Sequence, residues 1–191
     1  MTTPSTNSDG LIDWLKDLAE SRDRGRLAAL RRGLLLEPNQ FYELYRVVPA
    51  RYLDGVSRAE IQRRLATAIL FASHPRSFSD EELAERPRNL GESLRRLAVE
   101  QAGGSIDPDE GPPEALKRRF DALLAAHVDE LFNHLRQIIR LLKSREIPVD
   151  WAQLLSDLRN WDNEDRQVQW RWSRSFYVGE RRAQETEGEV V

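Results

Sequence analysis

Residues 127–145, which read HVDELFNHLRQIIRLLKSR, decide the fold of this chain. Apolar residues recur in this segment at steps of three and four, and that spacing places them on one side of an α-helix. They are Val128, Leu131, Phe132, Leu135, Ile138, Ile139 and Leu142. Arg136, Arg140 and Lys143 follow the same spacing about 100° away from the apolar centre. The segment therefore predicts an amphipathic helix with a basic stripe, which is either a solvated flank of a core helix or a surface for phosphates.

The same periodicity predicts helices along the rest of the chain, because no stretch shows the sustained two-residue alternation of a strand. Gly33 is expected to end the second helix as a C′ residue, and Ser57 to open the long central helix with capping-box spacing. The expected helices cover residues 10–19, 21–32, 38–48, 57–74, a short turn at 79–82, 89–100, 114–125, 127–145, a segment opened by Pro148 and a last helix capped by Asp162.

Residues 101–113, QAGGSIDPDEGPP, are rich in glycine, proline and acid, and they predict a linker between two lobes. The fold class is therefore all-α, as a two-lobed helical bundle. The N-terminal helical lobe covers residues 1–105, and the C-terminal lobe, with Trp- and Arg-rich helices, covers residues 106–191. The acidic residues 180–191 are expected to fray.

The charge is unevenly distributed, although the net charge is only −3. Residues 20–76 hold eleven Arg against six acids, whereas residues 77–111 hold four Arg against nine acids. A basic region of this kind fits a polyanionic partner better than the net charge suggests. Residues 80–85 are strongly acidic and are expected to face away from such a partner.

Composition predicts a cytoplasmic protein that does not enter a membrane. Hydrophobic residues make up 40 % of the chain, charged residues make up 32 %, and no run of 18 apolar residues exists. The polar N-terminus lacks the basic-then-apolar order of a signal peptide. Cysteine is absent, so neither a disulfide nor a thiol nucleophile is available.

Motifs for catalysis find little support. His127, Glu130 and His134 could share one helix face, and they form the only metal-like grouping in the sequence. Residues 107–111 resemble a calcium loop, but a proline stands where such a loop needs glycine. No glycine-rich loop for phosphates exists. We expect a protein that is not an enzyme and that has no cofactor or small-molecule substrate.

The aromatic residues near the C-terminus divide by helix face. Trp172 and Phe176 are four residues apart and are predicted to lie in the core. Trp170 falls on another face, where it could be an exposed interface anchor. A helical adaptor that binds only proteins, through Trp170 and its arginine-rich faces, is therefore an alternative to a nucleic-acid-binding protein. A helical nuclease is a third and weaker one.

Several segments together resemble one family. They are KRRF at 117–120, HLR at 134–136, IPVDWAQLL at 147–155, NW at 160–161 and RSFY at 174–177. Looser agreement comes from LAALRRG at 27–33 and FY at 41–42. With these segments the chain resembles the small subunit of the type I-E CRISPR Cascade complex, the CasB family. The resemblance implies an all-α, two-lobed fold, which the helix pattern predicts independently.

The resemblance also implies partners and a role in antiviral defence. Such a subunit occurs as two copies in a surveillance complex with other Cascade subunits, built on a CRISPR RNA. It does not cut, but helps to hold the target DNA open as an R-loop, chiefly by contacts with single-stranded DNA. The family's basic surface maps onto Arg31, Arg32, Arg118 and Arg140, and helical spacing and charge add Arg58, Arg136, Lys143 and Arg166.

Overall fold

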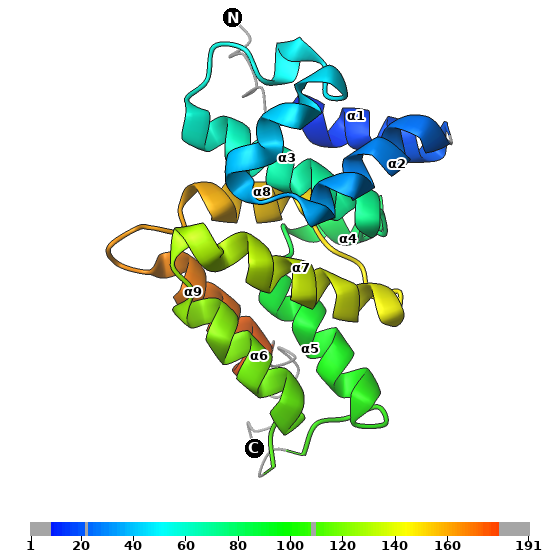
Figure 1. Cartoon of the computed structure of the whole chain (residues 1–191). Helices are drawn as coiled ribbons and strands as arrows, with labels where there is room; N and C mark the ends of the chain where they lie inside the picture. The colour runs from blue at the N-terminus through cyan, green and yellow to red at the C-terminus, as the bar shows by residue number, and fades with distance from the viewer. Residues whose placement is uncertain (1–8, 22, 108–109, 180–191) are drawn as a thin grey trace, which may run out of the picture.

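The computed structural model describes residues 9–21, 23–107 and 110–179, and the described chain is built from helices (Figure 1). No strand occurs in these ranges, where the only β-type pairing is a bridge between Ser77 and Val149. The all-α prediction is therefore confirmed. The α-helices are α1 (Asp9–Glu20), α2 (Arg24–Arg32), α3 (Arg58–Ser73), α4 (Asp80–Glu85), α5 (Leu90–Gln101), α6 (Glu114–Ala125), α7 (Val128–Ser144), α8 (Trp151–Arg159) and α9 (Gln167–Ser173).

Four helical turns of other types complete the chain. Three are 3₁₀ turns, and the last is a π-helical turn that extends α9. The segment after Pro38 was expected to be an ordinary helix, but it is 3₁₀. The four turns are η1 (Gly33–Leu35), η2 (Pro38–Arg46), η3 (Ala50–Tyr52) and η4 (Arg174–Val178).

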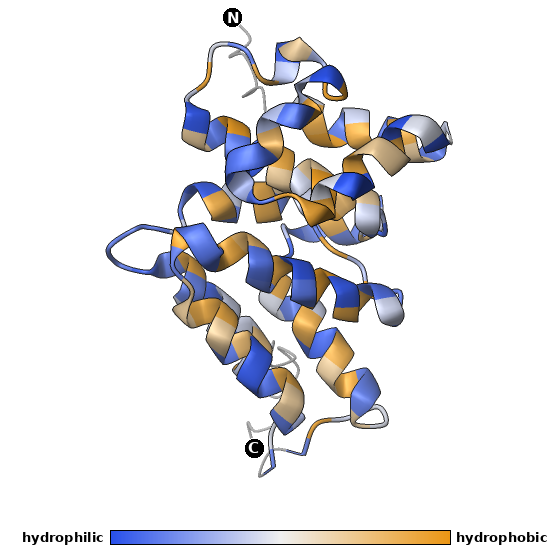
Figure 2. Ribbon diagram, viewed as in Figure 1, coloured by the Kyte–Doolittle hydropathy of each residue, from blue (hydrophilic) through white to orange (hydrophobic). Residues whose placement is uncertain are grey.

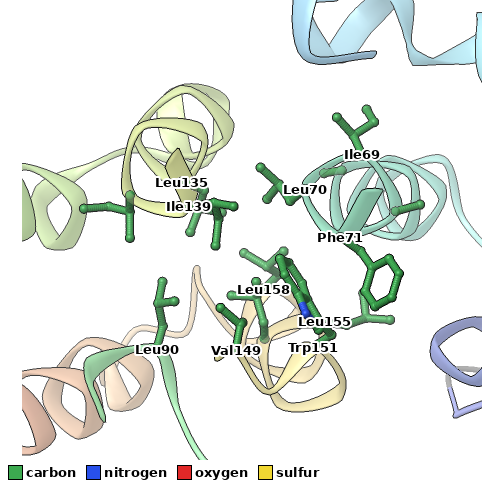
Figure 3. Packing of buried hydrophobic residues seen from close by; sticks show 14 of the residues in the cluster. Ile69, Leu70, Phe71, Leu90, Leu135, Ile139, Val149, Trp151, Leu155 and Leu158 are labelled. Atoms are coloured by element: carbon green, nitrogen blue, oxygen red, sulfur yellow. The ribbon is translucent and has the colours of Figure 1, made fainter. Parts of the chain in front are cut away.

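Helix α3 is the centre of the upper group of helices in Figure 1. Its nine consecutive residues from Arg64 to Ala72 are all buried, as expected for a helix that neighbours cover on every side. Helices α1, α2, α7 and α8 all pack against it. In Figure 3, Leu70 of α3, Ile139 of α7 and Leu155 of α8 point toward one another in this core.

A second group consists of α5, α6, α7, α9 and η4, in the lower part of Figure 1. Helix α5 packs against α7, α9 and η4, while α6 packs against α7. Hydrophobic and hydrophilic bands alternate along α5, α6 and α7 in Figure 2, as expected for helices with one buried face. The packing thus places α5, which precedes the 101–113 segment, with helices that follow it. A lobe boundary at 105/106 stays a prediction from sequence.

Both ends of α2 differ from the prediction. Asp23 caps the helix through its side chain, which accepts a hydrogen bond from the Arg26 amide, so α2 begins three residues later than expected. Gly33 has a φ of −58° and is not a left-handed C′ residue. A Cβ at this position would lie 2.6 Å from the Ile69 side chain. Glycine fits here because the Ile69 side chain of α3 packs directly against its backbone.

Two expected helix starts are also wrong. Pro148 precedes α8 rather than opening it, since the Asp150 side chain caps this helix by accepting from the Gln153 amide at 2.9 Å. Asp162 does not cap α9, because the N-cap residue is Arg166, whose φ of 50° lies in the left-handed region. A sharp turn at Arg166, rather than an Asp cap, starts α9.

A charged network joins α3 to α8. The Glu60 carboxylate accepts hydrogen bonds from Arg64 at 2.7 Å and from Arg159 at 2.5 Å. Burial raises the pKa of Glu60, but the two guanidinium groups outweigh burial and hold the pKa below its ordinary value. The two helices are thus joined by an ion pair as well as by apolar packing.

No helix in the described part of the chain is long and apolar enough to cross a membrane.

Candidate nucleic-acid interface

Helix α7 carries the basic stripe predicted from sequence. It covers Val128–Ser144, with His127 as N-cap, which confirms the helix expected over 127–145. Six of its apolar residues are buried, so the opposite flank faces outward. The stripe consists of Arg136, Arg140 and Lys143, and these residues do not have the same surroundings.

Arg136 is half-buried and already bound within the protein. Its Nη1 donates to the Leu34 carbonyl at 2.5 Å, and its Nη2 donates to Asn133 Oδ1 at 3.0 Å. Its guanidinium carbon lies 5.9 Å from the centre of the Phe132 ring. Arg136 therefore holds η1 against α7, and both of its terminal nitrogens are bonded within the protein.

The Arg136–Leu34 bond brings the end of α2 to the middle of α7. Arg31 and Arg32 form the last turn of α2, immediately before η1, and both side chains are exposed. Arg140 and Lys143 lie one and two turns beyond Arg136 and are also exposed. None of these four basic side chains has a hydrogen bond or ion pair with another described residue. We call Arg31, Arg32, Arg140 and Lys143 the α2–α7 track.

The other three predicted site residues lie outside this track. Arg58 is the exposed first residue of α3. Arg118 is exposed on α6, with its Nε 3.8 Å from Glu114. Arg166 donates to the Leu124 carbonyl at 2.5 Å. Within the described chain, no hydrogen bond or ion pair joins any of the three to the α2–α7 track.

A second basic surface was not predicted from sequence. A groove of about 1360 Å³ lies between α5, the preceding loop, α9 and η4. We call it the arginine groove. Its charged lining consists of Arg86, Arg88, Arg95, Arg96, Arg171 and Arg174, with Glu92 and Glu100.

Carboxylates hold several of these arginines in place. Arg86 forms a bidentate pair with Glu92 at 2.8 and 2.9 Å. Burial raises the pKa of the Glu92 carboxyl. The hydrogen bonds from Arg86 and the Asn89 amide, with the charges of Arg86 and Arg88, outweigh burial and hold the pKa below its ordinary value. Arg88 pairs with Glu85 at 2.8 Å, and Arg96 pairs with Glu82 at 2.6 Å. The acidic residues of α4 therefore position part of the groove.

Arg171 of α9 is held by a carboxylate of α8. It donates to the buried carboxylate of Asp157, which also accepts from Trp172 Nε1 at 2.6 Å and from Gln153 Nε2 at 2.7 Å. Burial raises the pKa of Asp157 and outweighs these donors. Asp157 thus anchors α9 and one groove arginine to α8.

The arginine groove could not be found from local charge. Its arginines come from residues 86–96 and 171–174, about 80 positions apart. The first of these segments lies in the most acidic part of the chain, so a running charge count hides it. The sequence signal that remains is only the pairing of arginines with acids three, four and six positions away.

His127, one member of the metal-like grouping, caps α7 in the structure. His127 accepts a hydrogen bond from the Asp129 amide at 3.4 Å as the N-cap of α7. Its Nδ1 also lies 3.3 Å from an Asp129 carboxylate oxygen. Among the described residues, no three His, Cys, Asp or Glu side chains are placed to hold a metal ion. The calcium-like segment 107–111 lies partly outside the described residues, as do residues 180–191.

The burial predicted for the aromatic residues is confirmed. Trp172 and Phe176 are fully buried, and Trp170 is 75 % exposed. Leu35 of η1 and Tyr42 of η2 are exposed large hydrophobic residues on the other group of helices. A role of Trp170 as an interface anchor stays a prediction.

Comparisons with known proteins agree with this architecture. The family model described as CRISPR-associated protein Cse2 matches residues 26–177. The CRISPR-associated protein Cse2 of Thermus thermophilus is 30 % identical over 181 residues, which are 94 % of this chain and 95 % of that protein.

Solved structures are similar over nearly the same length. The crystal structure of CasB from Thermus thermophilus has a TM-score of 0.69 and 26 % identity, and the match covers 93 % of this chain and 99 % of that one. A chain of a CRISPR RNA-guided surveillance complex, pre-nicking, has a TM-score of 0.67 and 31 % identity, with 89 % and 91 % covered. Its helical fold agrees with these matches, and the family model and the relative show that the chain belongs to the CRISPR-associated protein Cse2 family.

Proposed function

We propose that this protein is a non-catalytic small subunit of a CRISPR RNA-guided surveillance complex. In that complex it contacts other Cascade subunits and a second copy of itself. It binds the phosphate backbone of the target, chiefly as single-stranded DNA, and stabilises the R-loop. The observation that carries the proposal is the α2–α7 track, four exposed basic side chains without carboxylate partners in the described chain. The similar chain in a surveillance complex supports it.

The energetics of an R-loop suit such a subunit. The heteroduplex of guide and target is about as stable as the DNA duplex that it replaces, so small contributions decide the population. Basic side chains that contact phosphates contribute without reading sequence, because sequence is read by the guide RNA. A short track of exposed Arg and Lys is sufficient for this role.

The test compares two double variants. Arg140→Ala with Lys143→Ala removes half of the α2–α7 track, whereas Arg24→Ala with Arg46→Ala removes two exposed arginines outside it. Each phosphate contact on a single strand contributes about 0.7 to the slope of log affinity against log salt. The track variant should flatten this slope by about 1.4 for single-stranded DNA, and the control should not change it. Both should stay helical. Equal slopes in all three proteins, alone and in the assembled complex, would refute the proposal.

The exposed Trp170 favours a second candidate function, a protein adaptor without direct nucleic-acid binding. Trp170→Ala should then weaken assembly with the other subunits. The isolated wild type and the isolated variant should both fail to bind DNA. Pull-down of the complex subunits with wild type and with Trp170→Ala distinguishes this role. If both sets of variants show their effects, the protein binds nucleic acid and uses Trp170 for assembly, and the adaptor without nucleic-acid binding is excluded.

A further inference from the structure

Two guanidinium groups in the arginine groove have no carboxylate to balance their charge. Arg95 donates only to the main-chain carbonyls of Phe176 at 2.9 Å and Tyr177 at 3.3 Å. The Arg174 side chain has no hydrogen bond or ion pair with any described residue. The paired arginines around them are held in fixed positions by acids. The groove therefore presents a formed positive surface with unused charge.

Asn89 joins α5 to η4 at the groove. The residue is 8 % exposed, and its Nδ2 donates to Ser175 Oγ at 2.8 Å and to Glu92 at 3.3 Å. Because a carboxylate only accepts, these bonds fix the orientation of the amide. Its Oδ1 is buried and faces the Glu92 amide in the capping box at the start of α5. The two walls that carry Arg95 and Arg174 are therefore joined to each other.

A chain of nucleotides carries the negative charge that Arg95 and Arg174 lack in the arginine groove. Its phosphates match the planar donors of arginine. Arg171 and Arg174 can also stack on bases. The groove volume of about 1360 Å³ exceeds the usual 300–1,000 Å³ of a small-molecule site, which favours a chain of nucleotides over a single one.

We infer that the arginine groove binds a segment of single-stranded nucleic acid, as a second site that shares no residue with the α2–α7 track. The inference rests on the proposed function and extends it. A subunit with two separate phosphate-binding surfaces can hold one strand at two places, or two strands at once, and either arrangement opposes closure of the DNA duplex.

The first test measures binding of a labelled oligodeoxynucleotide in the Arg140→Ala, Lys143→Ala background, where the α2–α7 track is weakened. Adding Arg174→Ala should flatten the remaining salt slope by about 0.7, and Arg174→Glu should weaken binding further. Arg46→Glu in the same background is the matched control and should have a smaller effect. Arg174 has no described partner, so both substitutions should leave the fold intact, which circular dichroism checks.

The second test locates the ligand directly. The chain has no cysteine, so a single one can be introduced at Val178, which lines the groove and is 55 % exposed, or at exposed Ala50 as control. An oligonucleotide should slow thiol modification at position 178 and leave position 50 unchanged. Adenosine monophosphate and poly-glutamate at equal charge concentration should protect poorly.

Each other outcome overturns the inference. Equal protection by the mononucleotide would indicate a pocket for a free nucleotide, and equal protection by poly-glutamate would indicate a site for acidic protein segments. An oligonucleotide that binds the wild type but protects neither position would show that the groove is not a site. If the wild type binds no oligonucleotide at all, the proposed function fails, whereas loss of binding only in track variants refutes the groove alone.

Discussion

His74 is the buried histidine of the described chain, with 2 % of its surface exposed at the end of α3. Its Nε2 lies 2.7 Å from the Ile147 carbonyl oxygen. Since a carbonyl only accepts, Nε2 carries the hydrogen and Nδ1 does not need one. Burial lowers the pKa of His74; the Ile147 bond and Glu146 raise it, and Lys143 and Arg76 lower it, with a net decrease. The neutral ring is therefore the form that joins α3 to the segment before α8.

A lowered pKa makes stability depend on pH in one direction. Below about pH 6.5 the unfolded chain binds a proton at His74 that the folded chain takes up only at lower pH. The free energy of unfolding should therefore fall as pH decreases from 7.5 to 5.5, and His74→Gln, whose amide can still donate to Ile147, should reduce this fall. Urea unfolding at both pH values measures it, with exposed His127→Gln as control. An equal fall in all three proteins would exclude His74 as the cause.

At the scale of elements, α5 and α9 meet at a glycine. A Cβ on Gly91 would lie 2.2 Å from the carbonyl oxygen of Trp172, a distance that the α9 backbone cannot accept without moving. Helix propensity alone favours alanine over glycine by about 1 kcal/mol, so sequence reasoning predicts that Gly91→Ala stabilises. The packing predicts the opposite sign.

Gly91→Ala should lower the free energy of unfolding by at least about 2 kcal/mol, because an overfilled contact must displace a helix. Gly25→Ala is the matched control: this glycine lies in α2, where a Cβ would meet only Asp23 at an ordinary 3.6 Å. It should leave stability unchanged or raise it by up to about 1 kcal/mol. Chemical denaturation of both variants decides between the signs, and a stabilising Gly91→Ala would mean that the close approach is not maintained in solution.

At the scale of the whole molecule, one hydrophobic cluster extends from Leu11 in α1 to Phe176 in η4. It contains residues from both sides of the 101–113 segment, including Leu94 of α5 and Leu123 of α6. In Figure 1, α5 lies with α6, α7 and α9, although it precedes that segment. The two halves of the chain therefore share a core.

A shared core predicts cooperative unfolding. Far-ultraviolet circular dichroism, which follows helices in both halves, and fluorescence of the Trp residues, four of which lie at 151–172, should show one coincident transition. Residues 1–105 expressed alone should lack a cooperative transition, because α5 loses its partners α7, α9 and η4. Two separate transitions, or a stable fragment, would instead support two lobes that fold independently.

The sequence by itself determined that the chain is helical and which faces of its main helices are buried. The spacing of apolar residues in 127–145 predicts α7, and Ser57 and Ser79 start α3 and α4 with side-chain caps as expected. These properties depend on residues within a few positions of one another, so a local pattern contains them. Pattern also predicts that Trp172 is buried while Trp170 is exposed, since the two lie on different helix faces.

Only the tertiary structure decided which basic residues lie together and which are already bonded within the protein. Arg136 belongs to the stripe by spacing, yet its guanidinium is bound to Leu34, which is 102 positions away. The arginine groove gathers Arg95 and Arg174 from segments whose local charges give no sign of it. Gly33 packs against the Ile69 side chain and Gly91 against the Trp172 backbone, and both neighbours are distant in sequence. The physical reason is the same in each case: periodicity and capping act along the chain, whereas charge pairing and close packing act through space.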